Sequence, residues 1–192
     1  MLEIVGKSKL TVLVLGLLIM SVSVSALVSA QEELLKAEQP ALITSAGQAP
    51  DAFQIKVIAD SVGLKYKYDP LAGEEMLEGT KTLILAVGAS LKGLGDAGIN
   101  FDQELSRIEN LIAKALERGI QIIAIHMGGE ARRDDRSNQI IQLVGPQVDY
   151  WIVREEGNKD GLFTEIAAGN PTPLTIIAQT FDLIGVFVKV FL

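Results

Sequence analysis

The segment Gln121–Glu130, QIIAIHMGGE, constrains the fold of this chain more than any other part of the sequence. Apolar residues rich in isoleucine run up to His126, as in a parallel strand that is buried on both faces. Gly128 and Gly129 then break the run and lead into a charged loop over residues 130–138. This pattern indicates the carboxyl end of a strand, which is where ligands bind in open α/β sheets.

Other apolar runs alternate with helical patterns along the chain. The predicted strands cover residues 41–44, 64–68, 81–87, 120–126, 148–153 and 174–178. The predicted helices cover residues 50–62, 73–78, 100–118, 139–144, 162–168 and 181–192. Such alternation predicts a mostly parallel sheet with right-handed crossovers. The expected fold class is therefore α/β, a three-layer, doubly wound, mostly parallel sheet of five or six strands, Rossmann- or flavodoxin-like.

Three local expectations concern the edge of the sheet where ligands bind. Phe53 and Val57 are assigned to the apolar side of the helix after the first strand. Residues 88–98 are rich in glycine and are predicted to form a loop. Ser137 or Asn138 is expected to cap the short helix that follows, because both side chains accept an N–H at a helix start.

Residues 1–30 have the three parts of a secretory signal peptide. Lys7 and Lys9 give a basic start, an apolar run follows from Leu10 to Met20, and Val28-Ser29-Ala30 supplies small residues for cleavage. An uncleaved membrane anchor is the alternative, since the apolar region is nearly long enough to span a bilayer. We expect cleavage and an exported protein, in the extracellular space, the cell envelope or the periplasm.

Cleavage leaves a lead-in segment at residues 31–39 and a single α/β domain at residues 40–192. The chain has no cysteine, which excludes disulfides, thiolate nucleophiles, zinc–thiolate sites and a lipoprotein anchor. Its net charge of −7 disfavours binding to nucleic acids and to anionic membrane surfaces. We therefore expect no nucleic-acid partner and no membrane attachment after cleavage, and the sequence leaves a protein partner unknown.

The loop after the first strand, Ser45–Asp51, is the first candidate for ligand binding. Gly47 and Gln48 place backbone N–H groups at a helix N-terminus, where a carboxylate or phosphate can bind. A tight turn that needs glycine for its backbone shape is the alternative. Gly88 and Ser90 follow the third strand on the same edge and are further candidates.

Residues 93–98, GLGDAG, match the G-x-G-x-x-G pattern of dinucleotide-binding sites. The match lies several residues beyond the third strand instead of directly after the first, and no acidic residue ends the next strand, so a glycine loop is preferred. A single histidine without cysteine argues against zinc, and no loop signature supports Mg²⁺ or Ca²⁺. We expect no cofactor and no metal.

His126 could act as a general base or bond to a ligand that Gly128 and Gly129 allow to approach. It could equally be a buried strand residue bonded to a backbone carbonyl. Arg132 and Arg133 could hold a carboxylate or phosphate bidentately. The alternative for the arginines is a solvated loop in which neighbouring carboxylates neutralise them.

Three motifs occur in order along the chain: SAGQ at residues 45–48, HMGG at residues 126–129 with two arginines after it, and DGLF at residues 160–163. As a set they resemble a bacterial family of exported Rossmann-like domains that is classed as a domain of unknown function. The resemblance covers nearly all of the chain after the signal peptide. It implies a signal peptide and a single α/β domain, and it brings no activity or ligand.

Three functions are compatible with these features. The preferred one is an exported small-ligand-binding or sensor module for an anionic ligand at the carboxyl ends of the strands. The first alternative is a hydrolase-type enzyme that uses His126 as base with Glu156 or Asp160, although the sequence shows no paired nucleophile and base. The second is a structural or partner-binding protein whose apolar C-terminus docks elsewhere.

Overall fold

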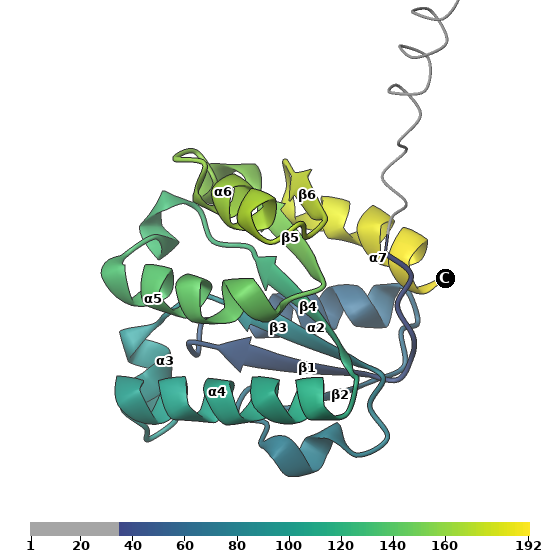
Figure 1. The fold of residues 1–192 in the computed structure, drawn as a ribbon, viewed down its shortest axis with the longest axis horizontal. Coiled ribbons are helices and arrows are strands. Elements are labelled where there is room, and N and C mark those ends of the chain that lie inside the picture. Colours follow the sequence, from purple (N-terminus) through teal and green to yellow (C-terminus); the bar gives the residue numbers. More distant parts are fainter. Residues whose placement is uncertain (1–34) are drawn as a thin grey trace, which may run out of the picture. The chain divides into compact units, whose positions relative to one another are not determined.

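Residues 35–192 are described by the computed structural model, and the predicted signal peptide lies outside them. Six strands form one sheet in the order β2-β1-β3-β4-β5-β6, and every neighbouring pair is parallel. Figure 1 shows this sheet with helices on both sides. The predicted α/β fold class, a doubly wound parallel sheet, is therefore confirmed.

The elements alternate along the chain as the sequence predicts. The strands are β1 (Ala41–Ala46), β2 (Tyr66–Tyr68), β3 (Thr82–Val87), β4 (Gln121–His126), β5 (Tyr150–Arg154) and β6 (Leu174–Ile177). The helices are α2 (Asp51–Ser61), α3 (Leu91–Asp96), α4 (Phe101–Glu117), α5 (Asp135–Val144), α6 (Leu162–Gly169) and α7 (Leu183–Phe191). Short 3₁₀ turns are η1 (Glu74–Leu77), η2 (Glu130–Arg132), η3 (Gly145–Gln147), η4 (Glu155–Gly157) and η5 (Thr180–Asp182).

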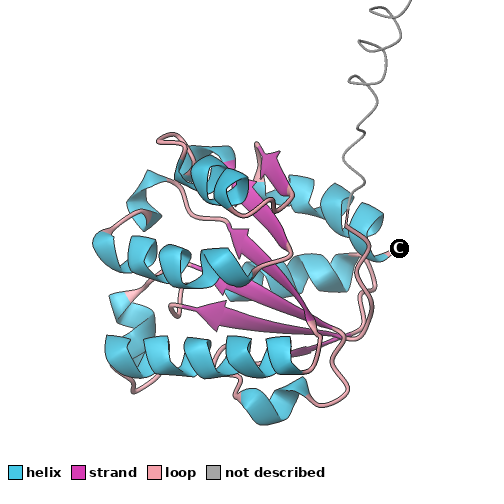
Figure 2. Cartoon of the chain, viewed as in Figure 1, coloured by secondary structure: helices cyan, strands magenta, loops and turns pink. Residues whose placement is uncertain are grey.

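The central strands are buried on both faces, which explains why their sequences are apolar without alternation. On β3, Leu83 and Leu85 pack with α4, α5 and α6, whereas Ile84 and Ala86 pack with α2 and α7 on the opposite face. Figure 2 shows the helices on the two faces of the sheet. Each fully buried leucine or isoleucine contributes about 1.5–3 kcal/mol to folding, so these two cores account for most of the driving force.

The strand order reverses between β1 and β3. From β1 the chain crosses through α2 to β2 on one side, and then returns to β3 on the other side of β1. The loops that follow β1 and β3 therefore run in opposite directions, and a crevice opens between them at the carboxyl edge. This topology places the candidate site beside the β1–α2 loop.

The prediction that Phe53 and Val57 belong to the buried side of α2 is wrong. Phe53 is 57% exposed and Val57 is 48% exposed. The helix instead packs on the sheet through a stripe that includes Ala52, Ile55 and Ala59, because small alanine side chains let its axis approach closely. Phe53 and Val57, four residues apart, form an apolar strip on another side of the helix.

The prediction of a glycine loop over residues 88–98 is also wrong in its central part. Helix α3 forms there, capped by Ser90, whose Oγ accepts a hydrogen bond from the N–H of Gly93 at 3.1 Å. Leu94 is buried and anchors the helix. Gly93 is a packing requirement, since a Cβ at that position would lie 1.9 Å from the carbonyl oxygen of Gln48.

Two further helices begin with side-chain caps. Asn100 caps α4 in a reciprocal capping box with Gln103. Helix α5 is capped by Asp134, whose carboxylate accepts from the N–H of Ser137 at 2.8 Å, so the predicted cap at Ser137 or Asn138 is wrong. The Ser137 hydroxyl is buried and accepts from the N–H of Ala89 at 3.0 Å.

None of the described helices is both long and apolar enough to cross a membrane.

Candidate functional site

The β1–α2 loop has a backbone shape that few residues can adopt. Gly47 has φ +112° and Gln48 has φ +59°. A Cβ on Gly47 would lie 2.3 Å from the carbonyl oxygen of Gly88, so only glycine fits. The loop after β1 is thereby pressed against the loop after β3.

Glu104, a fully buried residue of α4, accepts hydrogen bonds from this loop. Its Oε1 accepts from the N–H of Gly47 at 2.7 Å and from Gln48 Nε2 at 3.1 Å. Arg107 donates to both carboxylate oxygens, at 2.8 Å each, which neutralises the buried charge. The N–H of Gly47, which the sequence predicted as a donor to a bound anion, therefore already donates to a residue of the protein.

Glu104 and Arg107 are structural residues of the site that sequence reasoning missed. The available signal was the position of Glu104, four residues before Ile108 and thus on the buried stripe of α4. A carboxylate on such a stripe requires internal partners, because a buried charge without them is very costly. Ser45, also predicted for the site, is fully buried in β1, and its hydroxyl has no hydrogen-bond partner in the described part of the chain.

His126 is fully buried at the end of β4. Its Nδ1 lies 2.8 Å from the carbonyl oxygen of Val87, and because a carbonyl only accepts, Nδ1 carries the proton. A Cβ added to Gly157 would lie 2.8 Å from Nε2, and the Phe163 ring centroid lies 5.0 Å from the imidazole centroid. Burial lowers the pKa of His126 from 6.5 to about 4, so the ring is neutral at pH 7.

Arg133 is occupied by contacts within the protein. Its guanidinium donates to both carboxylate oxygens of Asp160, at 2.9 and 2.8 Å, to the Gly157 carbonyl and to Asn138 Oδ1 at 2.9 Å. It also lies over the Phe163 ring, 5.3 Å from the centroid. Arg133 therefore ties the loop after β4 to the loop after β5, and these contacts lower the pKa of Asp160.

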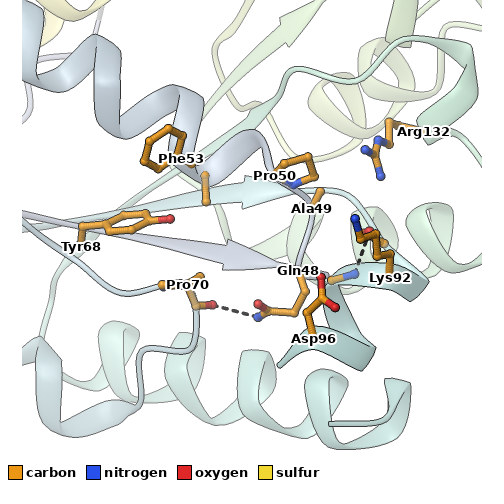
Figure 3. Close-up of a pocket in the computed structure, with 12 residues that line it drawn as sticks. Gln48, Ala49, Pro50, Phe53, Tyr68, Pro70, Lys92, Asp96 and Arg132 are labelled. Atoms are coloured by element: carbon orange, nitrogen blue, oxygen red, sulfur yellow. Dashed lines mark hydrogen bonds between the residues drawn. The ribbon is translucent and has the colours of Figure 1, made fainter. Parts of the chain in front are cut away.

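Arg132 has a different environment from its neighbour. Among the described residues, its side chain makes one hydrogen bond, a long one from Nη1 to the Ala89 carbonyl at 3.3 Å. Its side chain reaches a cavity of about 370 Å³ on the carboxyl edge, beside the β1–α2 loop (Figure 3). The cavity is lined by Gln48, Ala49, Pro50, Ala52, Phe53, Tyr68, Pro70, Ser90, Lys92, Gly93, Asp96 and Arg132.

The two ends of this cavity differ in chemistry. Phe53 and Tyr68 lie together at one end, and Lys92, Asp96 and Arg132 lie toward the other, with the β1–α2 loop between them (Figure 3). The first end offers aromatic surface, and the second offers two cations beside one carboxylate. An arrangement of this kind suits a small molecule that carries an apolar body and a negative charge.

Asp51, at the start of α2, is a further residue whose burial the sequence did not reveal. It is 5% exposed, and its Oδ2 has no hydrogen-bond partner among the described residues. Burial raises the pKa of this carboxyl, while the positive charges of Arg132 and Arg154 act in the opposite direction. Asp51 therefore places a buried acid close to the cationic end of the cavity.

The structure divides the predicted site residues into two groups. Gln48, Ser90 and Arg132 line the cavity, and Gly47 and Gly88 pack directly behind them. Ser45 is buried within β1, and the others lie at the end of β4 and in the loop that follows it. There His126 and Arg133 are enclosed, a Cβ on Gly128 would meet the Arg132 side chain at 2.3 Å, and one on Gly129 would meet Glu156 at 2.8 Å.

A separate hollow of about 310 Å³ lies beside this second group. It is lined by Glu130, Arg133, Glu156, Gly157, Lys159 and Asp160. Its charged side chains all form ion pairs, Arg133 with Asp160, Lys159 with Glu130, and Glu156 with Arg154 of β5. Among residues 35–192 there is no group of three or more histidine, cysteine and acidic residues that could hold a metal ion.

Comparisons with known proteins give a family but no activity. A family model described as "Domain of unknown function (DUF6305)" matches residues 38–191. A solved structure of a GDSL-like lipase from Bacteroides thetaiotaomicron VPI-5482 is similar at 11% identity and a TM-score of 0.34, covering 77% of this chain and 70% of the lipase. Similarity at this level supports no inference about activity. No curated protein matches the sequence significantly.

Proposed function

The chain belongs to the family described as a domain of unknown function (DUF6305), and from this premise we propose that it binds a small anionic ligand in the cavity beside the β1–α2 loop. The observation that carries the proposal is the difference between the two adjacent arginines. The guanidinium of Arg133 donates hydrogen bonds to Asp160, Gly157 and Asn138. Arg132 keeps most of its donors available at the cavity wall.

Two further features support an anion at this place. Lys92 also lines the cavity and forms no ion pair with any described residue, so a second cation faces the same space. The cavity also lies where the strand order reverses, the usual ligand position in open α/β sheets. The hydrolase alternative gains no comparable support, because His126 is enclosed and its pKa is about 4.

Replacement of Arg132 by alanine tests the proposal. We expect anions that raise the melting temperature of the unmodified protein to bind Arg132→Ala more weakly by about 1.5–3 kcal/mol, the range for a hydrogen bond to a charged group. Titration calorimetry with a panel of small carboxylates and phosphates measures this. The stability of the unliganded protein should fall only modestly, because the side chain makes one long hydrogen bond and shares with Arg154 its charge interaction with Asp51.

Arg136→Ala is the matched control, because Arg136 is an exposed residue nearby that does not line the cavity. Its affinity for the same anions should equal that of the unmodified protein. Equal losses of affinity in both variants would show that the change in net charge alone causes the effect. If no anion binds the unmodified protein, the proposal is refuted.

We also propose that the protein is exported and that its mature form begins at Gln31. The support is the arrangement of basic, apolar and small residues in positions 1–30. Amino-terminal sequencing of protein recovered outside the cytoplasm should start at Gln31. A membrane-bound product that starts at residue 1 would favour the uncleaved anchor.

A further inference from the structure

Phe53 is exposed although it lies at a folded and otherwise well-packed edge of the molecule. More than half of its surface, 57%, faces solvent, and it lines the cavity together with Tyr68, Pro50 and Pro70. Aromatic side chains contribute large apolar area with little loss of conformational freedom, which makes them efficient contact surfaces for flat ligands. This end of the cavity is therefore suited to a planar apolar group.

The cationic end limits the charge that the ligand can carry. Lys92 and Arg132 are accompanied by the carboxylate of Asp96, which leaves one positive charge in excess among the residues that line the cavity. Asp51 lies close enough to Arg132 for the two charges to interact. The excess of one positive charge among the lining residues matches a monoanion, and a second negative charge on the ligand would have no unpaired cation to face.

The size of the cavity limits the ligand further. A volume of about 370 Å³ is near the lower end of the range of roughly 300–1,000 Å³ for ligand pockets. The aromatic and cationic groups lie toward opposite ends of this space (Figure 3). A ligand that contacts both must carry its ring and its charged group at opposite ends of a short molecule.

We infer that the ligand is a small aromatic carboxylate whose ring lies against Phe53 and Tyr68 and whose carboxylate faces Arg132 and Lys92. This inference rests on the proposed function, because it names the chemical class of the anion bound at the same site. It assigns Phe53 as the residue that selects aromatic over aliphatic ligands. Arg132 supplies affinity for the carboxylate whatever it is attached to.

The test compares phenylacetate, cyclohexylacetate, acetate and phenyl phosphate by titration calorimetry on the purified chain. We expect phenylacetate to bind about tenfold more tightly than acetate, since burial of a ring contributes at least the free energy of one decade in affinity. Cyclohexylacetate and phenyl phosphate should bind more weakly than phenylacetate. Phe53→Ala should abolish the preference for phenylacetate over acetate and leave the affinity for acetate unchanged.

Val57→Ala provides the control, because Val57 is exposed one turn along the same helix and does not line the cavity. It should retain the full preference. Acetate as tight as phenylacetate, or a preference that survives Phe53→Ala, would overturn the aromatic assignment and leave the anion site standing. Tighter binding of phenyl phosphate would overturn the assignment of a monoanion. If none of the four probes binds, and no other anion does, the anion site itself is wrong.

Discussion

At the scale of single residues, neighbours with the same chemistry have opposite roles in this protein. Arg133 donates four hydrogen bonds to three residues, whereas Arg132 points its guanidinium into a cavity with one long hydrogen bond. The sequence shows two adjacent arginines and gives no means to rank them. Their difference depends on Asp160 and Gly157, which lie more than twenty residues away along the chain.

His126 likewise has an environment that the sequence does not reveal, and this environment supports a prediction about pH. The fold lowers its pKa from 6.5 to about 4, so the folded state binds fewer protons than the unfolded state between these values. The contribution of His126 to the free energy of unfolding should therefore be fully present above pH 6.5. It should fall by about 3 kcal/mol as the pH drops from 6.5 toward 4. Denaturant melts at several pH values measure this loss.

His126→Asn is the variant that isolates the effect. Its side-chain amide can still donate to the Val87 carbonyl but cannot titrate. The variant should be less stable at pH 7, because it loses ring contacts with Phe163, and its stability should depend less on pH between 6.5 and 4. An undiminished slope in His126→Asn would show that other groups cause the acid sensitivity.

At the scale of elements, long apolar runs were predictable and short polar segments were not. The run from Thr82 to Val87 is apolar on both faces and is a central strand, as its sequence predicts. Residues 91–96 contain two glycines and still form α3, because contact with the β1–α2 loop outweighs helix propensity. The edge position of β2 was likewise predictable from its alternating pattern, which exposes one face.

The two glycines of α3 make a matched pair for mutation. Alanine at Gly93 would place its Cβ 1.9 Å from the Gln48 carbonyl oxygen, so the variant should lose roughly 1–3 kcal/mol of stability and displace the cavity wall. Alanine at Gly95 meets no atom within 4 Å and should stabilise the helix by roughly 0.5–1 kcal/mol. Thermal melts of both variants, with and without a bound anion, check this. Equal effects of the two changes would contradict the close packing of α3 on the loop.

At the scale of the whole molecule, the alternation of strands and helices determined the fold class, but not the order of the strands. The reversal between β1 and β3 creates the crevice, and it follows from the side on which each crossover packs. The chain has a net charge of −7, which disfavours the approach of anions at long range. Binding therefore depends on the local cations Lys92 and Arg132, and a site of this kind cannot be read from composition.

The most direct measurement is a crystal structure of the protein soaked with phenylacetate. We expect density for the ligand in the cavity beside the β1–α2 loop, with its carboxylate about 2.7–2.9 Å from the Arg132 guanidinium and its ring against Phe53. Density for the carboxylate in the hollow beside Arg133 and Lys159, with the cavity at Arg132 empty at saturating ligand, would contradict it.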